Sequence, residues 1–418
     1  MADLRDDQAH AQVKTAIITV DPLRPDDALL MPAAQAIRQG ELVAFPTETV
    51  YGLGANALDA TAVARIFAVK GRPADNPLII HLADLAVLNQ LIDHLPPLAE
   101  KLFAAFSPGP LTLVLPRSRH VPDEVTAGLD TVAIRLPAHP IARRLIQLAG
   151  LPIAAPSANR SGRPSPTRAW HVIQDLGGLI PYVVDGGACH YGLESTVVDA
   201  TGSVPVILRP GSITAADIRR IAGSVAGAVG EPAEHSSRTP RAPGMKYRHY
   251  APRARVIVVE GDTPDQRLAR MRIHLDELRR QTGLVGVLAC RRLLAGLPGE
   301  QIDAADAFHG DRPGLVSGRP ALAADRPALA ADRPREGDSE AYYGFAYGVE
   351  PDPDAAANAL FHAMRILDQL GVAVILAEGL PDEDRGAAYM NRLRKAAGSG
   401  QQPSAQQDTS TNACFHDT

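Results

Sequence analysis

The sequence has few cysteines and no long apolar run. Its cysteines, Cys189, Cys290 and Cys414, lie far apart and form no C-x-x-C pair, which excludes a disulfide framework and a cysteine zinc site. Apolar runs stay below the ~18 residues that a membrane span needs, and the N-terminus is acidic rather than basic and then apolar. We therefore expect a soluble, cytoplasmic protein without a membrane partner.

The signatures of several well-known nucleotide and hydrolase sites are also missing. The chain has no G-x-x-x-x-G-K-[ST] loop, no kinase signature and no G-x-S-x-G elbow. With 42 Lys and Arg against 47 Asp and Glu, the net charge is -5, so no general basic field attracts nucleic acid or an anionic membrane. Any anion must therefore be bound by a local group of cations.

The composition that is present favours an α/β protein of more than one domain. Aromatic residues make up 4% of the 418 residues, whereas there are 35 Gly and 35 Pro, which indicates many turns around an aliphatic core. This usage disfavours a helical bundle, and the length predicts two or three domains. Between about residues 28 and 222, short β-branched runs alternate with amphipathic segments, as expected where crossover helices cover a mixed sheet.

The expected elements of this first domain follow from its periodicity. Helices are expected at 61–70, which Gly71 and Pro73 end, and at 139–148 and 167–176. The expected strands are residues 42–45, 78–82, 111–115, 132–136, 153–155, 182–184, 196–199 and 206–208.

A linker and a smaller α/β domain follow. Residues 223–254 are rich in Gly, Ala, Pro and Ser and predict a linker, and 255–397 predict the second domain. Its expected strands and helices are 256–259, 264–280, 285–288, 355–370 and 372–376. An RPALAAD repeat at 319–325 and 326–332 has too few large apolar side chains for a core, so we expect a disordered insertion at about 311–338 and a disordered tail at 398–418.

The segment FPTETVYGLGANA is the first candidate for ligand contacts. Gly52, Gly54 and Ala57 nearly fit the dinucleotide fingerprint G-x-G-x-x-G/A, but Pro46 interrupts the approach from the strand, which favours a tight turn. Its hydroxyls, with Thr49 among them, either contact a ligand at a strand end or satisfy the turn backbone.

KGRPADNPLIIHL is the second candidate. Lys70 and Arg72 flank a glycine that ends a helix, so both cations could reach one anion, and phosphate fits the pair. The alternative is a solvated cationic cap of the helix. His81, within a predicted strand, would by default be a core histidine.

Two further motifs place charge and hydroxyls beside strands. Arg135 in VAIRLP stands between Ile134 and Leu136, so its guanidinium needs a ligand anion or an internal salt bridge. In PSANRSGRPSPT, small hydroxyls, glycine and backbone N–H groups could approach a phosphate chain, although an ordinary Ser-rich loop would look similar.

Together with SPGPLTLVL, ESTVVD and LRPGSIT, these motifs resemble, in order and spacing, the YrdC-like family of threonylcarbamoyl-AMP synthases. The resemblance covers about 28–222, and APGMKYRHYAP with the following α/β unit is similar to the long two-domain form. It implies a twisted mixed YrdC-like sheet with flanking helices and a smaller Rossmann-like C-terminal domain.

The resemblance also implies the reaction. L-threonine, bicarbonate or CO2, and ATP with Mg2+ would give threonylcarbamoyl-adenylate and pyrophosphate, and the product would pass to the tRNA threonylcarbamoyl transferase machinery, with weak or indirect tRNA binding. The catalytic signature falls on Lys70, Arg72, Ser157 and Asn159. By position, the threonine site would involve Thr49, His81, Arg135, Ala155 and Ser195. ATP would contact Arg72, Asn76, Thr131, Ser157, Ser165, Arg209, Arg248 and His249.

Two other functions stay open at this point: a YrdC-like RNA-binding module without catalysis, and a regulatory role in which the second domain senses a ligand. Steep salt dependence would mark RNA binding through phosphates. The KYRHY segment of the linker, residues 246–250, is either a solvated cationic strip or a lid over a nucleotide in the first domain.

Overall fold

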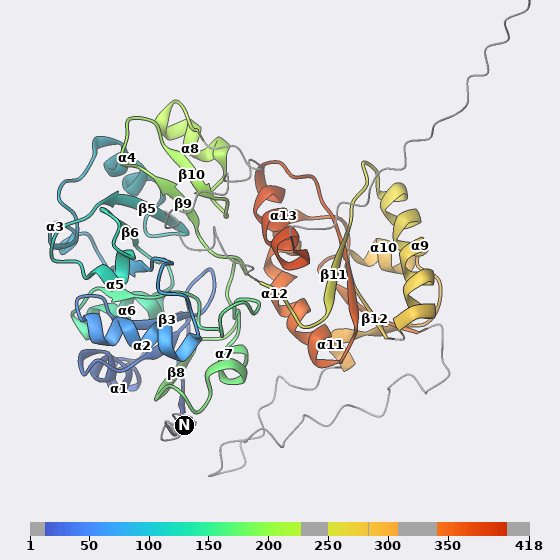
Figure 1. Cartoon of the computed structure of the whole chain (residues 1–418), viewed down its shortest axis with the longest axis horizontal. Coiled ribbons are helices and arrows are strands. Elements are labelled where there is room, and N and C mark those ends of the chain that lie inside the picture. The colour runs from blue at the N-terminus through green and yellow to red at the C-terminus, as the bar shows by residue number, and fades with distance from the viewer. Residues whose placement is uncertain (1–12, 227–249, 283, 308–340, 399–418) are drawn as a thin grey trace, which may run out of the picture.

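The computed structural model describes residues 13–226, 250–282, 284–307 and 341–398, which form two α/β domains (Figure 1). The expected insertion at 311–338, the tail after 398 and most of the linker lie outside the described residues. Within the described ranges, no helix combines the length and the apolar character that crossing a membrane requires.

The first domain is built on a mixed sheet with the strand order β1-β8-β2-β3-β7-β4-β6-β5-β9-β10. Its strands are β1 (Ala16–Thr19), β2 (Val43–Phe45), β3 (Gly52–Asn56), β4 (Ile79–His81), β5 (Leu111–Pro116), β6 (Thr131–Arg135), β7 (Ile153–Ala154), β8 (Tyr182–Asp185), β9 (Thr196–Asp199) and β10 (Val206–Arg209). Parallel pairs such as β4 with β6 stand beside antiparallel pairs such as β5 with β6, which confirms the predicted mixed sheet.

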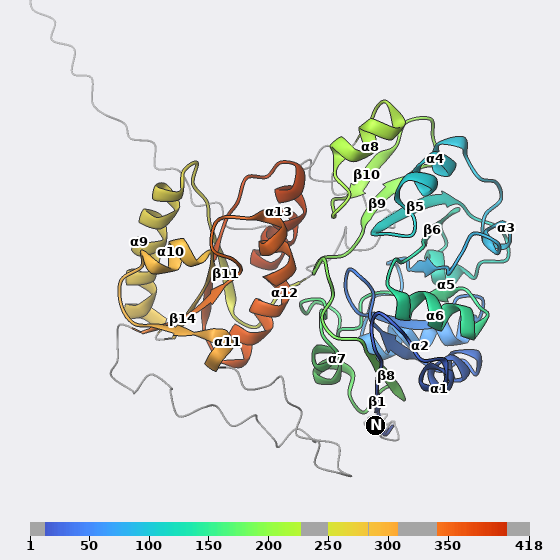
Figure 2. The same cartoon turned by 180° about the vertical axis from the view of Figure 1, so that it is seen from behind.

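Helices cover both faces of this sheet (Figures 1 and 2). They are α1 (Asp27–Arg38), α2 (Ala60–Lys70), α3 (Leu88–Leu91), α4 (Pro97–Phe106), α5 (Asp123–Thr126), α6 (Pro140–Ala149), α7 (Ala169–Leu176) and α8 (Ala215–Ala222). Strand β2 shows why two layers form. Val43 and Phe45 pack in the core with α1 and α6, and Ala44 between them packs in the opposite core with α2, because side chains alternate along a strand.

The second domain has a sheet in which every described pair is parallel, with the order β11-β15-β12-β14-β13. Its elements are β11 (Arg255–Val259), α9 (Pro264–Thr282), β12 (Val285–Ala289), α10 (Arg291–Ala295), β13 (Gln301–Asp303), α11 (Ala304–Ala307), β14 (Tyr342–Ala346), α12 (Pro353–Gln369), β15 (Val374–Glu378) and α13 (Asp384–Ala397). This smaller parallel-sheet domain confirms the predicted fold class.

Helices α12 and α13 form the face of the second domain that meets the first (Figures 1 and 2). Asn358 Nδ2 of α12 donates to the carbonyls of Cys189 and His190 at 3.2 and 2.5 Å. Arg365, also on α12, pairs with the buried carboxylate of Asp175 at 2.7 Å. The two domains therefore share an interface that contains a buried ion pair and more exposed hydrogen bonds.

The structure differs from the sequence-based elements in several places, and two of the differences concern strands of the first sheet. The sheet begins at β1, before the predicted start at residue 28, and YGLGANA contains strand β3 rather than the predicted tight turn. The physical reason is close packing, because a Cβ on Gly54 would lie 2.7 Å from Phe45 and 2.8 Å from Ile153. Gly54 is therefore needed inside the sheet, and the glycines lie within strand β3 rather than in the turn between a strand and a helix that a dinucleotide site requires.

Candidate functional site

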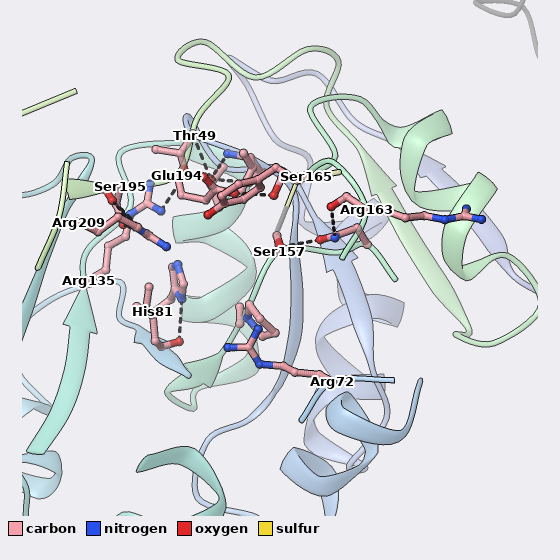
Figure 3. Close-up of a pocket in the computed structure, with 18 residues that line it drawn as sticks. Thr49, Arg72, His81, Arg135, Ser157, Arg163, Ser165, Glu194, Ser195 and Arg209 are labelled. Carbon is pink, nitrogen blue, oxygen red and sulfur yellow. Dashed lines mark hydrogen bonds between the residues drawn. The ribbon is translucent and has the colours of Figure 1, made fainter. Parts of the chain in front are cut away.

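The site is a cavity where several strand ends and loops of the first domain converge (Figure 3). It holds about 660 Å³ of empty space, including the solvent at its mouth. Most predicted site residues line it: Thr49, Arg72, His81, Arg135, Ala155, Ser157, Asn159, Ser165, Ser195 and Arg209. Residues distant in sequence thus come together in one cavity.

One wall of the cavity is organised by Arg135 at the end of β6. Its Nη2 lies 2.7 Å from Glu48 Oε1, and its Nη1 donates to Thr49 Oγ1 at 2.9 Å. Burial raises the pKa of Glu48, but the charge of Arg135 and hydrogen bonds lower that pKa further, so the carboxylate stays ionised. The internal salt bridge that the sequence left open is therefore present, and further N–H groups of the guanidinium remain for a ligand.

His81 lies on β4 beside this wall. Its ring is buried and Nδ1 lies 3.2 Å from the carbonyl oxygen of Ile79. Burial, reinforced by the nearby Arg135, lowers the pKa of His81 to about 3. His81 is therefore a neutral imidazole near pH 7, able to donate or accept a hydrogen bond in the cavity.

Ser195, just before β9, and Arg209, the last residue of β10, form the next part of the wall. Arg209 donates through Nε to the backbone carbonyl of Ser195 at 3.1 Å, and through Nη2 to the hydroxyl of Ser195 at 3.2 Å. The same hydroxyl lies 2.7 Å from Thr112 Oγ1 of the neighbouring strand. These bonds hold a buried guanidinium at the cavity surface, where an anionic ligand can approach it.

The opposite wall is the loop after β7. Ser157 Oγ donates to Asn159 Oδ1 at 2.5 Å, and Asn159 Nδ2 donates to the carbonyls of Arg160 and Arg163 at 2.8 and 2.9 Å. The side chain of Arg163 points away from the cavity centre and pairs with Asp175 (Figure 3). The loop is thereby fixed by its own side chains rather than left as an open Ser-rich segment.

The two predicted phosphate cations take different places. Arg72 lines the cavity and donates to the carbonyls of Asn76 and Pro77 at 3.3 and 3.1 Å. Lys70 is buried outside the cavity lining, where its Nζ donates to the carbonyls of Ser157 and, at 2.6 Å, Asn159. Burial, followed by repulsion from Arg72, lowers the pKa of Lys70 well below its usual range. Lys70 therefore supports the loop, and it is not the solvated helix cap considered above.

Other predicted residues lie outside the cavity lining. Thr131 is the first residue of β6, and the extended strand puts it roughly 13 Å from Arg135 at its other end. Asn76 is fully buried, and neither its Oδ1 nor its Nδ2 has a hydrogen-bond partner within the described part of the chain. A buried amide normally finds a partner, so Asn76 stays a candidate for contact with a ligand or water. Arg248 and His249 lie outside the described residues.

Sequence reasoning missed Glu194 and Tyr250, which both line the cavity. Tyr250 has φ of 67°, and its ring stacks on Phe361 of α12 with centroids 5.1 Å apart. It belongs to the KYRHY segment, so that motif was the available signal, and the last residue of the segment does reach the cavity. The backbone N–H of Ala251 donates to the Gly162 carbonyl at 2.8 Å, which fixes the end of the linker against the loop after β7.

The described residues contain no group of three or more His, Cys, Asp and Glu side chains placed to hold a metal ion. Cations and hydroxyls dominate the lining instead. Arg72, Arg135 and Arg209 come from three separate segments, which suits a ligand with anionic groups at both ends. The arrangement thus suits a phosphate chain and a carboxylate.

Comparison with known proteins agrees with this geometry. Residues 35–211 match a family described as telomere recombination, and residues 213–398 match one described as threonylcarbamoyl-AMP synthase, C-terminal domain. A threonylcarbamoyl-AMP synthase of Pyrococcus abyssi is 47% identical over 368 residues, which are 88% of this chain and 93% of that protein. The Bacillus subtilis threonylcarbamoyl-AMP synthase is 41% identical over 379 residues, 90% of this chain and 95% of its own length.

A solved structure is similar over both domains. The crystal structure of P. abyssi Sua5 complexed with L-threonine has a TM-score of 0.74 and 44% sequence identity to this chain. The match covers 92% of this chain and 98% of the other. The likeness therefore includes both domains.

Proposed function

This chain belongs to the two-domain threonylcarbamoyl-AMP synthase family, and we propose that it forms L-threonylcarbamoyl-adenylate as a nucleotidyltransferase. The substrates are L-threonine, bicarbonate or CO2, and ATP, and the products are the adenylate, pyrophosphate and, from bicarbonate, water. The observation that carries the proposal is one cavity with Arg135 and His81 on one side and Arg72 on another. Such a cavity suits a small amino acid beside a nucleotide.

Threonine binds, on this proposal, at the wall formed by Thr49, His81, Arg135, Ala155 and Ser195. Its carboxylate accepts from the guanidinium of Arg135, which Glu48 and Thr49 already hold in one orientation. A relative, P. abyssi Sua5, has been crystallised with L-threonine, which supports threonine as the amino acid. A polar partner for the threonine hydroxyl rejects valine more strongly than a methyl pocket rejects serine.

ATP occupies the part of the cavity lined by Arg72, Ser157, Ser165 and Arg209. The N–H groups of Arg72 and Arg209 face the phosphates, and the hydroxyls of Ser157 and Ser165 allow close approach of the chain. Mg2+ would be held by the oxygens of the triphosphate and would reduce its charge. Asn76, whose amide has no hydrogen-bond partner among the residues that the structure describes, is one further candidate contact.

The reaction needs no nucleophilic side chain. The neutral amine of threonine attacks CO2 and loses a proton, so that a carbamate forms. A carbamate oxygen then attacks the α-phosphorus of ATP, and the bond to the β-phosphate oxygen breaks with release of pyrophosphate. Negative charge grows on the phosphoryl oxygens, and preorganised cations such as Arg72 and Arg209 stabilise it. Lys70 contributes by fixing the Ser157 and Asn159 carbonyls.

Purified protein with Mg2+, ATP, bicarbonate and each amino acid in turn tests the proposal through pyrophosphate release. We expect release with threonine and bicarbonate together, because the carbamate is the nucleophile. Equal release after rigorous removal of CO2 would contradict this mechanism. If no adenylate forms and tRNA binding weakens steeply with salt, the RNA-binding alternative is correct instead. The adenylate is expected to serve tRNA threonylcarbamoylation in the cytoplasm.

A further inference from the structure

A side chain of the second domain reaches the edge of the cavity in the first. Arg392 on α13 is fully buried, and its Nε lies 3.0 Å from Oε2 of Glu194. Its Nη1 donates to the Pro210 carbonyl at 2.7 Å, and its Nη2 donates to the Glu194 carbonyl at 3.3 Å. The guanidinium also lies 5.8 Å from the ring centroid of Tyr250. Arg392 therefore joins the segment before β9, which contains Glu194, to the segment after β10, which contains Pro210.

Glu194 itself belongs to the cavity wall. Among the described residues that line the cavity, it carries the single carboxylate. Its Oε1 accepts from Ser165 Oγ at 2.5 Å, and Ser165 is one of the residues assigned above to ATP (Figure 3). Burial raises the pKa of Glu194, but the charges of Arg392 and Arg209 and the hydrogen bond from Ser165 lower it further. The side chain is therefore anionic.

An anion at this place opposes the binding of a triphosphate. Charges in a buried site interact more strongly than in water, so an unpaired Glu194 would repel the nucleotide. Arg392 cancels that charge from the side away from the cavity. It does not line the cavity, so it acts through Glu194 and not by touching the ligand.

We propose that Arg392 is a positioning residue which the second domain supplies to the nucleotide site: it neutralises and orients Glu194, so that the cavity accepts ATP. This inference rests on the proposed function, since it takes ATP as the ligand. It gives the second domain a defined part in the reaction, because without α13 Glu194 would lose its direct ion pair with Arg392 and keep only the hydrogen bond from Ser165 and the charge of Arg209. The Glu194 segment and the end of the linker would then also lose their common support.

The test compares Arg392→Met with Glu194→Gln/Arg392→Met in the full chain. Arg392→Met should raise KM for ATP and the Kd of a non-hydrolysable ATP analogue by about tenfold or more, while KM for threonine changes much less. Removing the carboxylate in the double variant should restore most of the affinity for the analogue. A purely structural role would not give this rescue.

Asn358→Ala is the matched control. It removes the interdomain hydrogen bonds to Cys189 and His190 but touches no residue of the cavity lining. It should leave KM for ATP unchanged even if the thermal midpoint falls. If Asn358→Ala raises KM for ATP as much as Arg392→Met does, general loosening of the interface explains both effects and the proposal is wrong.

Two further outcomes of the experiment also decide the proposal. Should Arg392→Met fail to fold, the analogue is measured with Glu194→Gln and with the double variant, which should bind it within about threefold of each other. A large additional loss in the double variant overturns the proposal. A wild-type protein that binds the analogue but releases no pyrophosphate with any amino acid contradicts the proposed function, while the charge rescue in analogue binding still decides the inference.

Discussion

Arg135 Nη2 and Glu48 Oε1 lie 2.7 Å apart, and their side chains are 4% and 9% exposed. The guanidinium is therefore already neutralised before any ligand arrives. On the proposed function, a threonine carboxylate would not have to supply the compensating charge, and it would meet a guanidinium held in a fixed orientation. Of the two interpretations of Arg135 that the sequence left open, the salt bridge is present, and the ligand contact stays a prediction.

Arg135→Lys should chiefly weaken threonine binding. Lysine keeps the charge but cannot reproduce a planar guanidinium that serves Glu48, Thr49 and a carboxylate together. We expect KM for threonine to rise by about tenfold or more, with a smaller change in KM for ATP. Steady-state kinetics with each substrate varied in turn measures both. An unchanged KM for threonine would remove Arg135 from the threonine site.

Glu48→Gln should destabilise the fold, because it leaves the Arg135 guanidinium buried without its anion. Breaking a buried pair by removing one partner typically costs about 3 to 5 kcal/mol in the free energy of unfolding. Urea denaturation of wild type and variant gives this difference. The control is Glu41→Gln, which removes the exposed ion pair with Arg65 and should cost less than about 1 kcal/mol. If Glu48→Gln and Glu41→Gln lower the free energy of unfolding equally, the buried pair stabilises the fold no more than the exposed pair does.

Arg72→Met and Lys70→Met should separate charge stabilisation from loop support. Arg72 lines the cavity, so its loss should lower kcat more than tenfold, by about 2.7 to 4 kcal/mol in activation free energy, with little change in thermal midpoint. Lys70 is buried under the loop, so its loss should lower the thermal midpoint and kcat together. Calorimetry beside kinetics distinguishes them. A folded Arg72→Met variant with a normal kcat would show that Arg72 does not stabilise the transition state.

Much of the fold could be predicted from the sequence because its central elements are strongly patterned. The helix expected at 61–70 is α2, Ala60–Lys70, and Gly71 ends it with φ of 61°. The edge strand β1 was missed, since its residues are mostly exposed and it has no alternation of buried side chains. Strand β3 was missed because GLGAN has low strand propensity, and its pairing depends on space beside Phe45 that no local pattern reveals.

The candidate site was predictable where its residues stand in compact motifs, and not where it depends on distant contacts. Arg72, Ser157 and Arg209 stand in recognisable segments and do line the cavity. Arg392 lies 198 residues from Glu194, and only the docking of α13 onto the first domain joins them. Lys70 was predicted as a catalytic cation, but the direction of its side chain follows from where the loop after β7 packs, which is a tertiary effect.

His81 should make the stability of the protein depend on pH. Its pKa is lowered from 6.5 to about 3 by burial, so between these values the unfolded state carries a proton that the folded state excludes. The unfolded state then binds more protons, and stability rises with pH across this window by up to about 1.4 kcal/mol per pH unit from this group. Stability from His81 is thus fully present above pH 6.5 and is lost as the pH falls toward 3.

Urea unfolding of wild type and His81→Gln between pH 7 and pH 4 measures this contribution. Glutamine keeps a polar side chain in place of the neutral imidazole but binds no proton. The free energy of unfolding of the wild type should therefore fall relative to that of His81→Gln as the pH drops below the ordinary pKa of histidine, about 6.5. His171 also has its pKa lowered, by burial and by the charge of Arg365, and it adds a slope of the same sign to both proteins. That shared slope cancels in the difference. Parallel stability curves for the two proteins would mean that His81 is accessible enough to take up its proton in the folded state, and it would then not be a neutral group in the threonine wall.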